Sequence, residues 1–311
     1  MKNDAAKLIC IGASSLVVAM CGCSLYFSPL AKQTAAFGNA AAVVVRDSSD
    51  AYDTVERVTY DAGVSSLVLD FDSKGFNRKR FKPFLPEHDL EVRKTLLAAL
   101  STYAQNLADI AGDQAFGPLD EQTKSLSDSL VTLSGNGELK KIAPSLNESE
   151  AKGLAAAVDT LAKVLIEHKR RRQLPATLHK MQPVIEQVCS LLAEDIGNPH
   201  IDGRRGRGLR DQLWNEYDML IDNQTDFISG YSNKFTPEEK AAEIAKLPKL
   251  VVEQQSADAA LASTQSALRD LVEAHKALLT SKQTGTFHER LDELIKDGQN
   301  INAFYSSLNS K

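Results

Sequence analysis

The sequence predicts an all-α protein, an elongated antiparallel helical bundle with coiled-coil-like packing and about seven or eight helices. Two observations carry this prediction. Apolar residues recur at alternating steps of three and four, an average of 3.5 residues that is typical of helices packed as in coiled coils and up-down bundles. Glycine and proline interrupt the pattern at intervals of about one helix length. With 311 residues, 43% of them hydrophobic, the chain can bury a large core in one long domain or two smaller ones.

The individual helices follow from this stepping and from the breaks between its stretches. The 3-4 pattern runs over residues 96–110, 119–133, 154–165, 178–192, 250–278 and 287–308. The breaks fall at Gly112, Gly117-Pro118, Gly135-Asn136-Gly137, Pro144, Pro175, Gly197-Asn198-Pro199 and Gly285. Thr236 to Glu239 predicts a helix start, because it offers a capping hydroxyl, a proline at the first helical position and a glutamate three residues after the cap. We expect Pro248 to kink or restart that helix.

Residues 64–86 leave two interpretations open. Alternation of apolar and polar residues over 67–71 allows a short strand, and a helix that ends near Gly75 and passes into a loop fits equally well. The segment holds four phenylalanines: Phe71, Phe76, Phe81 and Phe84. Exposing four such side chains would be costly, so we expect them to pin this loop to the bundle.

The N-terminus has the pattern of an export signal. Lys2 and Lys7 precede an uncharged apolar run that begins at Leu8 and ends in small residues, which is the pattern of a secretory signal peptide. Three of the four cysteines lie within this run, and only Cys189 lies beyond it. The positions of the cysteines therefore indicate processing of the N-terminus rather than a disulfide scaffold.

The run resembles the signal of bacterial lipoproteins, whose lipobox places a small residue directly before the cysteine that receives the lipid. Gly22 precedes Cys23, so the resemblance implies lipidation at Cys23; Cys21 is the less favoured site because the bulky Met20 precedes it. Processing before Cys23 gives three parts: a signal peptide (1–22), a lipidated tether (23–31) and a helical-bundle body (32–311), with a possible subdivision near 197–208.

The resemblance implies a bacterial cell-envelope protein held by a lipid anchor. In enteric-type bacteria an aspartate after the lipidated cysteine tends to favour inner-membrane retention, so Ser24 favours the outer membrane, with the body facing the periplasm. Two other interpretations remain open. The uncharged run from Leu8 to Ala31 is long enough for an uncleaved membrane anchor, although its glycines and serines make it a weak spanning helix. It also fits an ordinary cleaved signal.

The sequence offers no pattern for metal, cofactor or catalytic chemistry. No two of the six histidines are three or four residues apart, and no Cys-x-x-Cys follows Cys23. Hydrolase, nucleotide-loop and dinucleotide motifs are also missing from it. We therefore expect no enzyme and no cofactor. The net charge of −5 and the export signal also make nucleic acid an improbable partner.

Several polar residues on the helical seams have a structural interpretation. His275 falls on the seam of the longest stretch, and we expect a buried histidine with one polar partner rather than a metal ligand. Gln254 and Thr264 on the same seam are interpreted as residues that set the register of packing. Cys189 lies between Val188 and leucines, which favours a small core residue over a reactive thiol.

Two basic clusters are candidates for binding. The cluster at residues 168–172 ends a helix, where it complements the helix dipole or contacts phosphate or membrane headgroups. The second cluster follows the helix predicted from Pro175 to Ile196 and opens the next one, with flexible glycines and four arginines: Arg204, Arg205, Arg207 and Arg210. Because free backbone N–H groups point out of a helix N-terminus, these arginines form a possible anion-binding loop.

Taken together, the sequence predicts a lipid-anchored, non-catalytic interaction or scaffold module of the envelope. The predicted partners are the membrane, through the acyl anchor, and a protein of the cell envelope. One alternative is a periplasmic binding or neutralising protein of the immunity type. Another is a binder of anions or lipid headgroups through the loop at Arg204–Arg210.

Overall fold

The computed structural model describes residues 29–76, 81–112, 121–135, 137, 139, 147–166, 173–200, 206–280 and 284–309. The helices in these ranges are α1 (Pro29–Lys74), α2 (Glu87–Ala111), α3 (Glu121–Gly135), α5 (Glu148–Ile166), α6 (Leu174–Ile196), α7 (Gly208–Gly230), α8 (Pro237–Ile244), α9 (Lys246–Leu279) and α10 (Thr284–Asn309). Apart from one isolated bridge between Asn198 and Arg207, no β-structure occurs in the described part of the chain. The predicted all-α bundle is confirmed.

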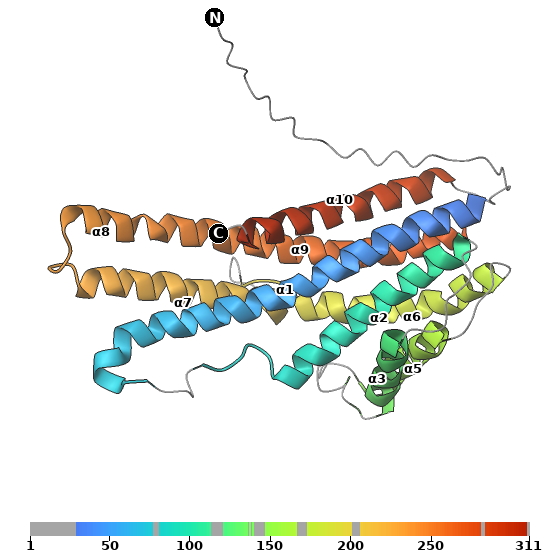
Figure 1. The fold of residues 1–311 in the computed structure, drawn as a ribbon, viewed down its shortest axis with the longest axis horizontal. Coiled ribbons are helices and arrows are strands. Elements are labelled where there is room, and N and C mark those ends of the chain that lie inside the picture. Colours follow the sequence, from blue (N-terminus) through green and yellow to red (C-terminus); the bar gives the residue numbers. More distant parts are fainter. Residues whose placement is uncertain are drawn as a thin grey trace, which may run out of the picture.

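The longest helix, α1, organises the whole bundle. Its 46 residues extend over roughly 70 Å at 1.5 Å per residue, and it runs nearly the full length of the molecule (Figure 1). Its first part packs against α2, α9 and α10, and its last part against α7. We divide the molecule into two regions. The proximal half comprises residues 29–57 of α1, residues 257–279 of α9, and all of α2, α3, α5, α6 and α10. Residues 58–76, α7, α8 and residues 246–256 of α9 form the distal arm.

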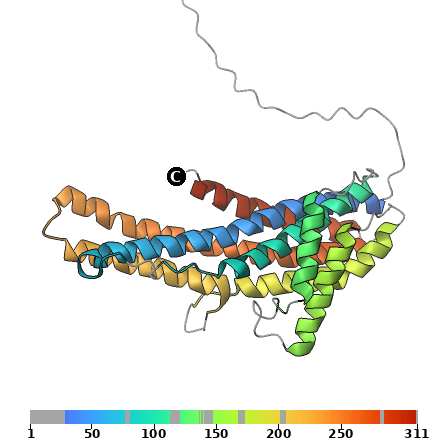
Figure 2. The same cartoon turned by 60° about the horizontal axis from the view of Figure 1, so that its bottom comes forward.

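Two helices stand apart from the long axis. α3 and α5 pack on each other and project as a hairpin from one side of the bundle (Figure 2). α3 buries only Ser127, Leu130 and Leu133. The Ser127 hydroxyl donates to the carbonyl oxygen of Ala162 at 3.1 Å, which joins the two helices of the hairpin.

The close approach of α1 and α2 depends on a glycine. A Cβ at Gly38 would overlap the carbonyl oxygen of Ala104 and lie 2.9 Å from the Cβ of Ala108. The two helices run antiparallel and are joined further along by the Ser101 hydroxyl, which donates to the carbonyl of Ala42 at 3.3 Å. A side chain at position 38 would push α1 and α2 apart.

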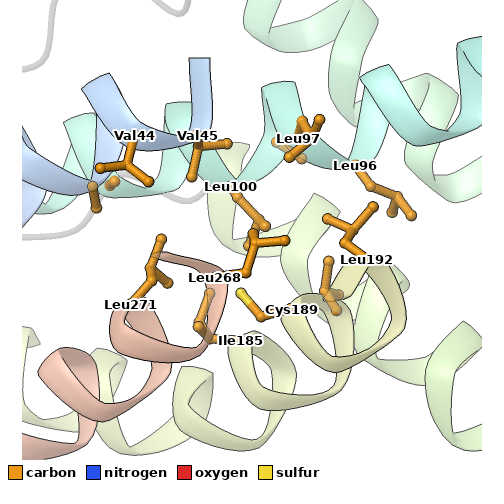
Figure 3. Packing of buried hydrophobic residues seen from close by; sticks show 14 of the residues in the cluster. Val44, Val45, Leu96, Leu97, Leu100, Ile185, Cys189, Leu192, Leu268 and Leu271 are labelled. Atoms are coloured by element: carbon orange, nitrogen blue, oxygen red, sulfur yellow. The ribbon is translucent and has the colours of Figure 1, made fainter. Parts of the chain in front are cut away.

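The core fills the proximal half. Leucines, valines and an isoleucine from α1, α2, α6 and α9 meet there, and Cys189 lies among them (Figure 3). Cys189 is 1% exposed, and burial raises the pKa of its thiol well above the ordinary value. The prediction that Cys189 is a core residue is confirmed, because a buried thiol with a raised pKa is a poor nucleophile.

The helix start predicted at Thr236 is confirmed, and both hydrogen bonds of its capping box are formed. Glu239 N–H donates to the Thr236 hydroxyl oxygen at 3.2 Å, and Thr236 N–H donates to the Glu239 carboxylate at 2.8 Å. Only Ala245 separates α8 from α9, so Pro248 lies in the first turn of a restarted helix, as predicted. If α8 and α9 are taken as one interrupted helix, the described residues hold eight helices.

The structure of residues 64–86 decides between the strand and the helix-and-loop interpretations, and it corrects the expectation about the phenylalanines. α1 continues to Lys74 and the chain then turns at Gly75, whose φ is +61°, so the described residues of this segment form helix and loop rather than strand. The expectation that all four phenylalanines pin the loop is wrong. Phe84 packs against the core, but Phe71 is 55% exposed and Phe76 is 63% exposed. The helical body also begins at Pro29, three residues before the predicted boundary.

Candidate functional sites

The predicted lipidation site lies outside the described residues, as does the alternative at Cys21. The structure describes the chain from Pro29, six residues after Cys23, where α1 begins. A search of the described helices for a stretch long and apolar enough to cross a bilayer finds none. The basic cluster at 168–172 also lies outside the described part of the chain.

The predicted anion-binding loop is described only in part. Arg204 and Arg205 lie outside the described residues. Arg207 is exposed, and its backbone N–H and carbonyl pair with Asn198 at 2.8 and 3.0 Å. Arg210 is committed to the bundle, because its guanidinium binds both carboxylate oxygens of Asp258 on α9 at 2.7 and 2.8 Å.

The surroundings of this loop are acidic. A Cβ at Gly206 would overlap the Asp211 carboxylate, so this carboxylate lies directly against the loop at the start of α7. A surface pocket of about 440 Å³ beside Gly208 is lined by Asp195, Asp211 and Glu216, among others. Burial raises the pKa of Glu216. The anion site stays a prediction, and these carboxylates and the ion pair of Arg210 count against it.

A buried polar cluster joins α1, α2 and α6 next to this pocket. Arg93 is 5% exposed and its guanidinium donates to both carboxylate oxygens of Asp195, at 2.6 and 2.7 Å. The Tyr52 hydroxyl donates to the same carboxylate at 3.0 Å, and Arg93 also donates to the carbonyl oxygen of Asp89 at 2.9 Å. Burial and the neighbouring Asp195 raise the pKa of Tyr52. With its charge paired and its hydrogen bonds made, the cluster is a structural clamp.

Sequence reasoning missed this clamp. Arg93 occupies a core-facing position one turn before Leu96 and Leu97, and a charged residue on an apolar seam signals a buried partner. Its partner, Asp195, lies 102 residues away. No local spacing could identify that carboxylate.

His275 occupies the predicted buried position, with two polar partners instead of one. Its Nδ1 lies 2.6 Å from Gln182 Oε1 and its Nε2 lies 2.9 Å from the Tyr103 hydroxyl. An amide oxygen only accepts, so Nδ1 carries the hydrogen and Nε2 accepts from Tyr103. The Phe37 ring packs edge-on at 5.6 Å. Burial lowers the pKa of His275 to about 4, so the ring is neutral at pH 7.

The second seam prediction concerns Gln254 and Thr264, which are both buried. The Gln254 amide donates to the Asp218 carboxylate at 2.8 Å and to the carbonyl oxygen of Trp214 at 3.2 Å. These bonds tie α9 to α7. The Thr264 hydroxyl instead donates to Ala260 in its own helix, at 2.9 Å, so of these two polar side chains Gln254 is the one that bonds across the α7–α9 contact.

Asp270 of α9 and Asp297 of α10 form a pair of neighbouring carboxylates. Burial, the neighbouring Asp297 and Glu293, and a hydrogen bond with Asp297 together raise the pKa of Asp270 to about 6. Arg290 opposes the shift but is engaged with Glu293, whose carboxylate lies 2.7 Å from its guanidinium. Negative charge on the neighbouring acids disfavours the charged form of Asp270.

A polar groove flanks α3, and two of its hydroxyls make hydrogen bonds within that helix. This groove of about 560 Å³ lies between α2 and α3 and includes Ser129 and Thr132. Ser129 donates to the carbonyl oxygen of Ser125 at 3.0 Å, and Thr132 to that of Asp128 at 3.0 Å. Across the described residues, no group of three or more His, Cys, Asp or Glu is placed to hold a metal ion.

Comparisons of the chain with protein-family models, with characterised proteins and with solved structures found no match. The chemistry of the sites and the shape of the bundle therefore carry the functional argument.

Proposed function

We propose that the chain is an exported bacterial lipoprotein, processed before Cys23, whose bundle acts as a non-catalytic interaction or scaffold module of the cell envelope. The observation that supports this proposal most is the place where the fold begins. α1 starts six residues after Cys23, a segment that spans at most about 20 Å when fully extended. An acyl anchor on Cys23 would therefore hold one end of the bundle close to the membrane.

The shape of the body supports a scaffold role. α1 carries the distal arm away from the anchored end over roughly 70 Å. Meanwhile the buried groups Arg93 and His275 and the half-buried Asp195 join helices to one another. What remains on the surface is a set of long helical faces, which suit contacts with a partner more than conversion of a substrate.

The anchor is tested by intact-mass analysis of protein extracted from membranes. We expect a chain that begins at residue 23 with the added mass of a diacylglyceryl or triacyl modification. Cys23→Ser should lose both the cleavage and the added mass, whereas the matched variant Cys21→Ser should keep them. An unprocessed wild-type chain of 311 residues would rule out the lipoprotein proposal.

The second candidate function is anion binding by the loop at Arg204–Arg210. Its test variant should leave Arg210 unchanged. Its ion pair with Asp258 means that an Arg210 variant would disturb packing as well as binding. The triple variant Arg204/Arg205/Arg207→Ala leaves that pair intact. Titration calorimetry with phosphate and sulfate should show weaker binding by the triple variant, and equal binding would remove this candidate.

A further inference from the structure

The last part of α1 carries a row of exposed apolar side chains on its outer face. Tyr60, Val64 and Val68 follow one another at intervals of four residues and are 60%, 36% and 52% exposed. The buried Val58 and Ala62 each lie two residues before a member of this row, and two residues correspond to about 200° around an α-helix. The row therefore points away from the packed side of α1, and we call it the ridge.

The ridge has the form by which a helix packs into a groove on another surface. Side chains four residues apart line up along a helix, and such rows fill the grooves between the side chains of neighbouring helices. The Phe81 ring lies 5.7 Å from the Tyr60 ring, measured between centroids, so the chain that returns from α1 supports the ridge at its first residue. Single exposed apolar residues are normal on protein surfaces, but three in one row indicate a contact surface.

An apolar groove of about 530 Å³ lies between α1 and α10 in the proximal half. Its lining includes small residues such as Ala36 and Gly298, and a Cβ at Gly298 would lie 2.8 Å from the Val44 side chain, so the two helices approach closely here. Val43 on α1 and Ile295 on α10 also line the groove and are 43% and 39% exposed. None of its ten lining residues is charged.

The ridge and this groove match in length and in charge. The groove extends over residues 36–44 of α1 and 295–303 of α10, and each of these stretches rises by about 12 Å, as does the ridge from Tyr60 to Val68. By contrast, the neighbouring groove of about 770 Å³ between α1, α2 and α3 includes Arg46 and Asp109. An uncharged helix face can enter the α1–α10 groove without stripping water from an ion, as in helix-in-groove recognition.

The ridge cannot enter the groove of its own molecule. α1 is continuous from Pro29 to Lys74, and Tyr60 lies 16 residues beyond Val44, about 24 Å along the helix. α10 lies along the first part of α1, whereas the ridge lies in the last part (Figure 1). A groove of this kind that the ridge can reach therefore belongs to a second copy of the chain.

We propose that the protein self-associates, with the ridge of one copy packed in the α1–α10 groove of the next. Because the two surfaces differ, the contact is heterologous and can link copies head to tail. Ten lining residues are fewer than the roughly 20–30 residues a side of a stable interface, so the contact should be weak in solution. The inference rests on the proposed scaffold function for its biological role, and attachment to a membrane would raise the local concentration. The contact itself needs no lipid.

The test measures self-association of the full chain in solution. Cys10, Cys21 and Cys23 are changed to Ser, so that the chain carries neither a lipid nor an N-terminal thiol, and Cys189 is buried. Sedimentation velocity from roughly 10 µM to 1 mM, the range suited to a small interface, should show an average mass that rises with concentration. A monomer at every concentration would overturn this inference and leave the lipoprotein proposal standing, because this chain cannot be lipidated.

Complementary variants assign the contact to the two surfaces. The ridge variant Val64→Glu/Val68→Glu keeps the groove, and the groove variant Val43→Glu/Ile295→Glu keeps the ridge. Each introduces charge where the contact excludes water, so each alone should associate about tenfold or more weakly than the parent chain. Mixed in equal amounts, the two variants should form dimers and no larger species, because each pair then holds one intact ridge and one intact groove.

A matched control separates this contact from a general effect of added charge. Val131→Glu/Ile244→Glu adds the same charge at residues that are 48% and 46% exposed and belong to neither surface. This variant should associate like the parent chain. Weaker association of the control, unchanged association of either surface variant, or a mixture that forms no dimers would overturn the inference.

Discussion

The proximal half and the distal arm share the helix α1 but differ in how they are stabilised. In the proximal half, α1 is one of several helices around a core that contains Leu100, Ile185 and Leu268 (Figure 3). In the distal arm, the buried apolar side chains of the described residues are only Val58, Ala62, Leu209, Leu213, Tyr217 and Ile228. Of the thirteen exposed large apolar side chains among described residues, nine lie in the arm. The difference predicts that the proximal half contributes most of the stability and that the arm contributes less.

The largest expected effect comes from the clamp at the edge of the proximal half. Arg93→Ala leaves the Asp195 carboxylate without its charged partner. Removal of one member of a fully buried pair costs about 3–5 kcal/mol, and because the Asp195 side chain is 18% exposed we expect a loss of about 3 kcal/mol. Lys74→Ala removes a surface pair in the arm, with its lysine 61% exposed, and should cost less than about 0.5 kcal/mol. Urea unfolding followed by circular dichroism measures both. Similar losses would show that the arm contributes to stability as much as the clamp does.

The next largest difference in stability between the two regions is expected when a buried apolar side chain is shortened to alanine. Leu268→Ala opens a cavity at a side chain that is 1% exposed, at a cost of about 2–5 kcal/mol. Ile228→Ala in the arm, at a residue 8% exposed, should cost about 1–2 kcal/mol because water and neighbouring side chains can fill the space. Thermal unfolding of the two variants against the wild type gives the comparison. An equal or larger loss for Ile228→Ala would contradict the division into a densely packed half and a weakly packed arm.

Acid should weaken the proximal half through His275. Its pKa is about 4 in the folded protein and about 6.5 when unfolded, so the unfolded chain binds the proton first as pH falls. Stability is therefore lost between about pH 6.5 and 4, by up to about 3 kcal/mol. His275→Gln should start less stable at pH 7 and lose less over this range. The check is the slope of unfolding free energy against pH, which must be smaller in the variant.

The smallest effect is expected at Asp270, which lies on the same helix as His275. Its ionisation lowers stability as pH rises, whereas His275 lowers stability as pH falls. The Asp270 pKa of about 6 means that the folded state holds a proton that the unfolded state has released, so this group lowers stability as pH rises from about 4 to 6. Asp270→Asn should raise stability at pH 7 by less than about 1 kcal/mol, because the site is partly solvated. At pH 4 the gain should vanish. Destabilisation at pH 7 would show that the carboxylate has a favourable partner.

The sequence predicts the local features of this molecule well and its contacts between distant residues poorly. Periodic burial gave α2, α6 and α9 their 3-4 stepping, and the local rules of capping located the start of α8 at Thr236. The expected burial of Phe71 and Phe76 was wrong, because apolar residues are usually but not always buried. The Arg93–Asp195 clamp depends on a contact across 102 residues, and the positions of Arg204 and Arg205 are not among those that the structure describes.

The continuity of α1 has a mechanical consequence. Because a single helix passes through both regions, a pulling force between its two ends is carried by one element whose hydrogen bonds run along the direction of the load. Such a force would shear α1 against α2 and α10 near its start and against α7 near its end. α1 is packed more deeply near its start than near its end. We therefore expect its contact with α7 to separate first under tension, before the core of the proximal half opens.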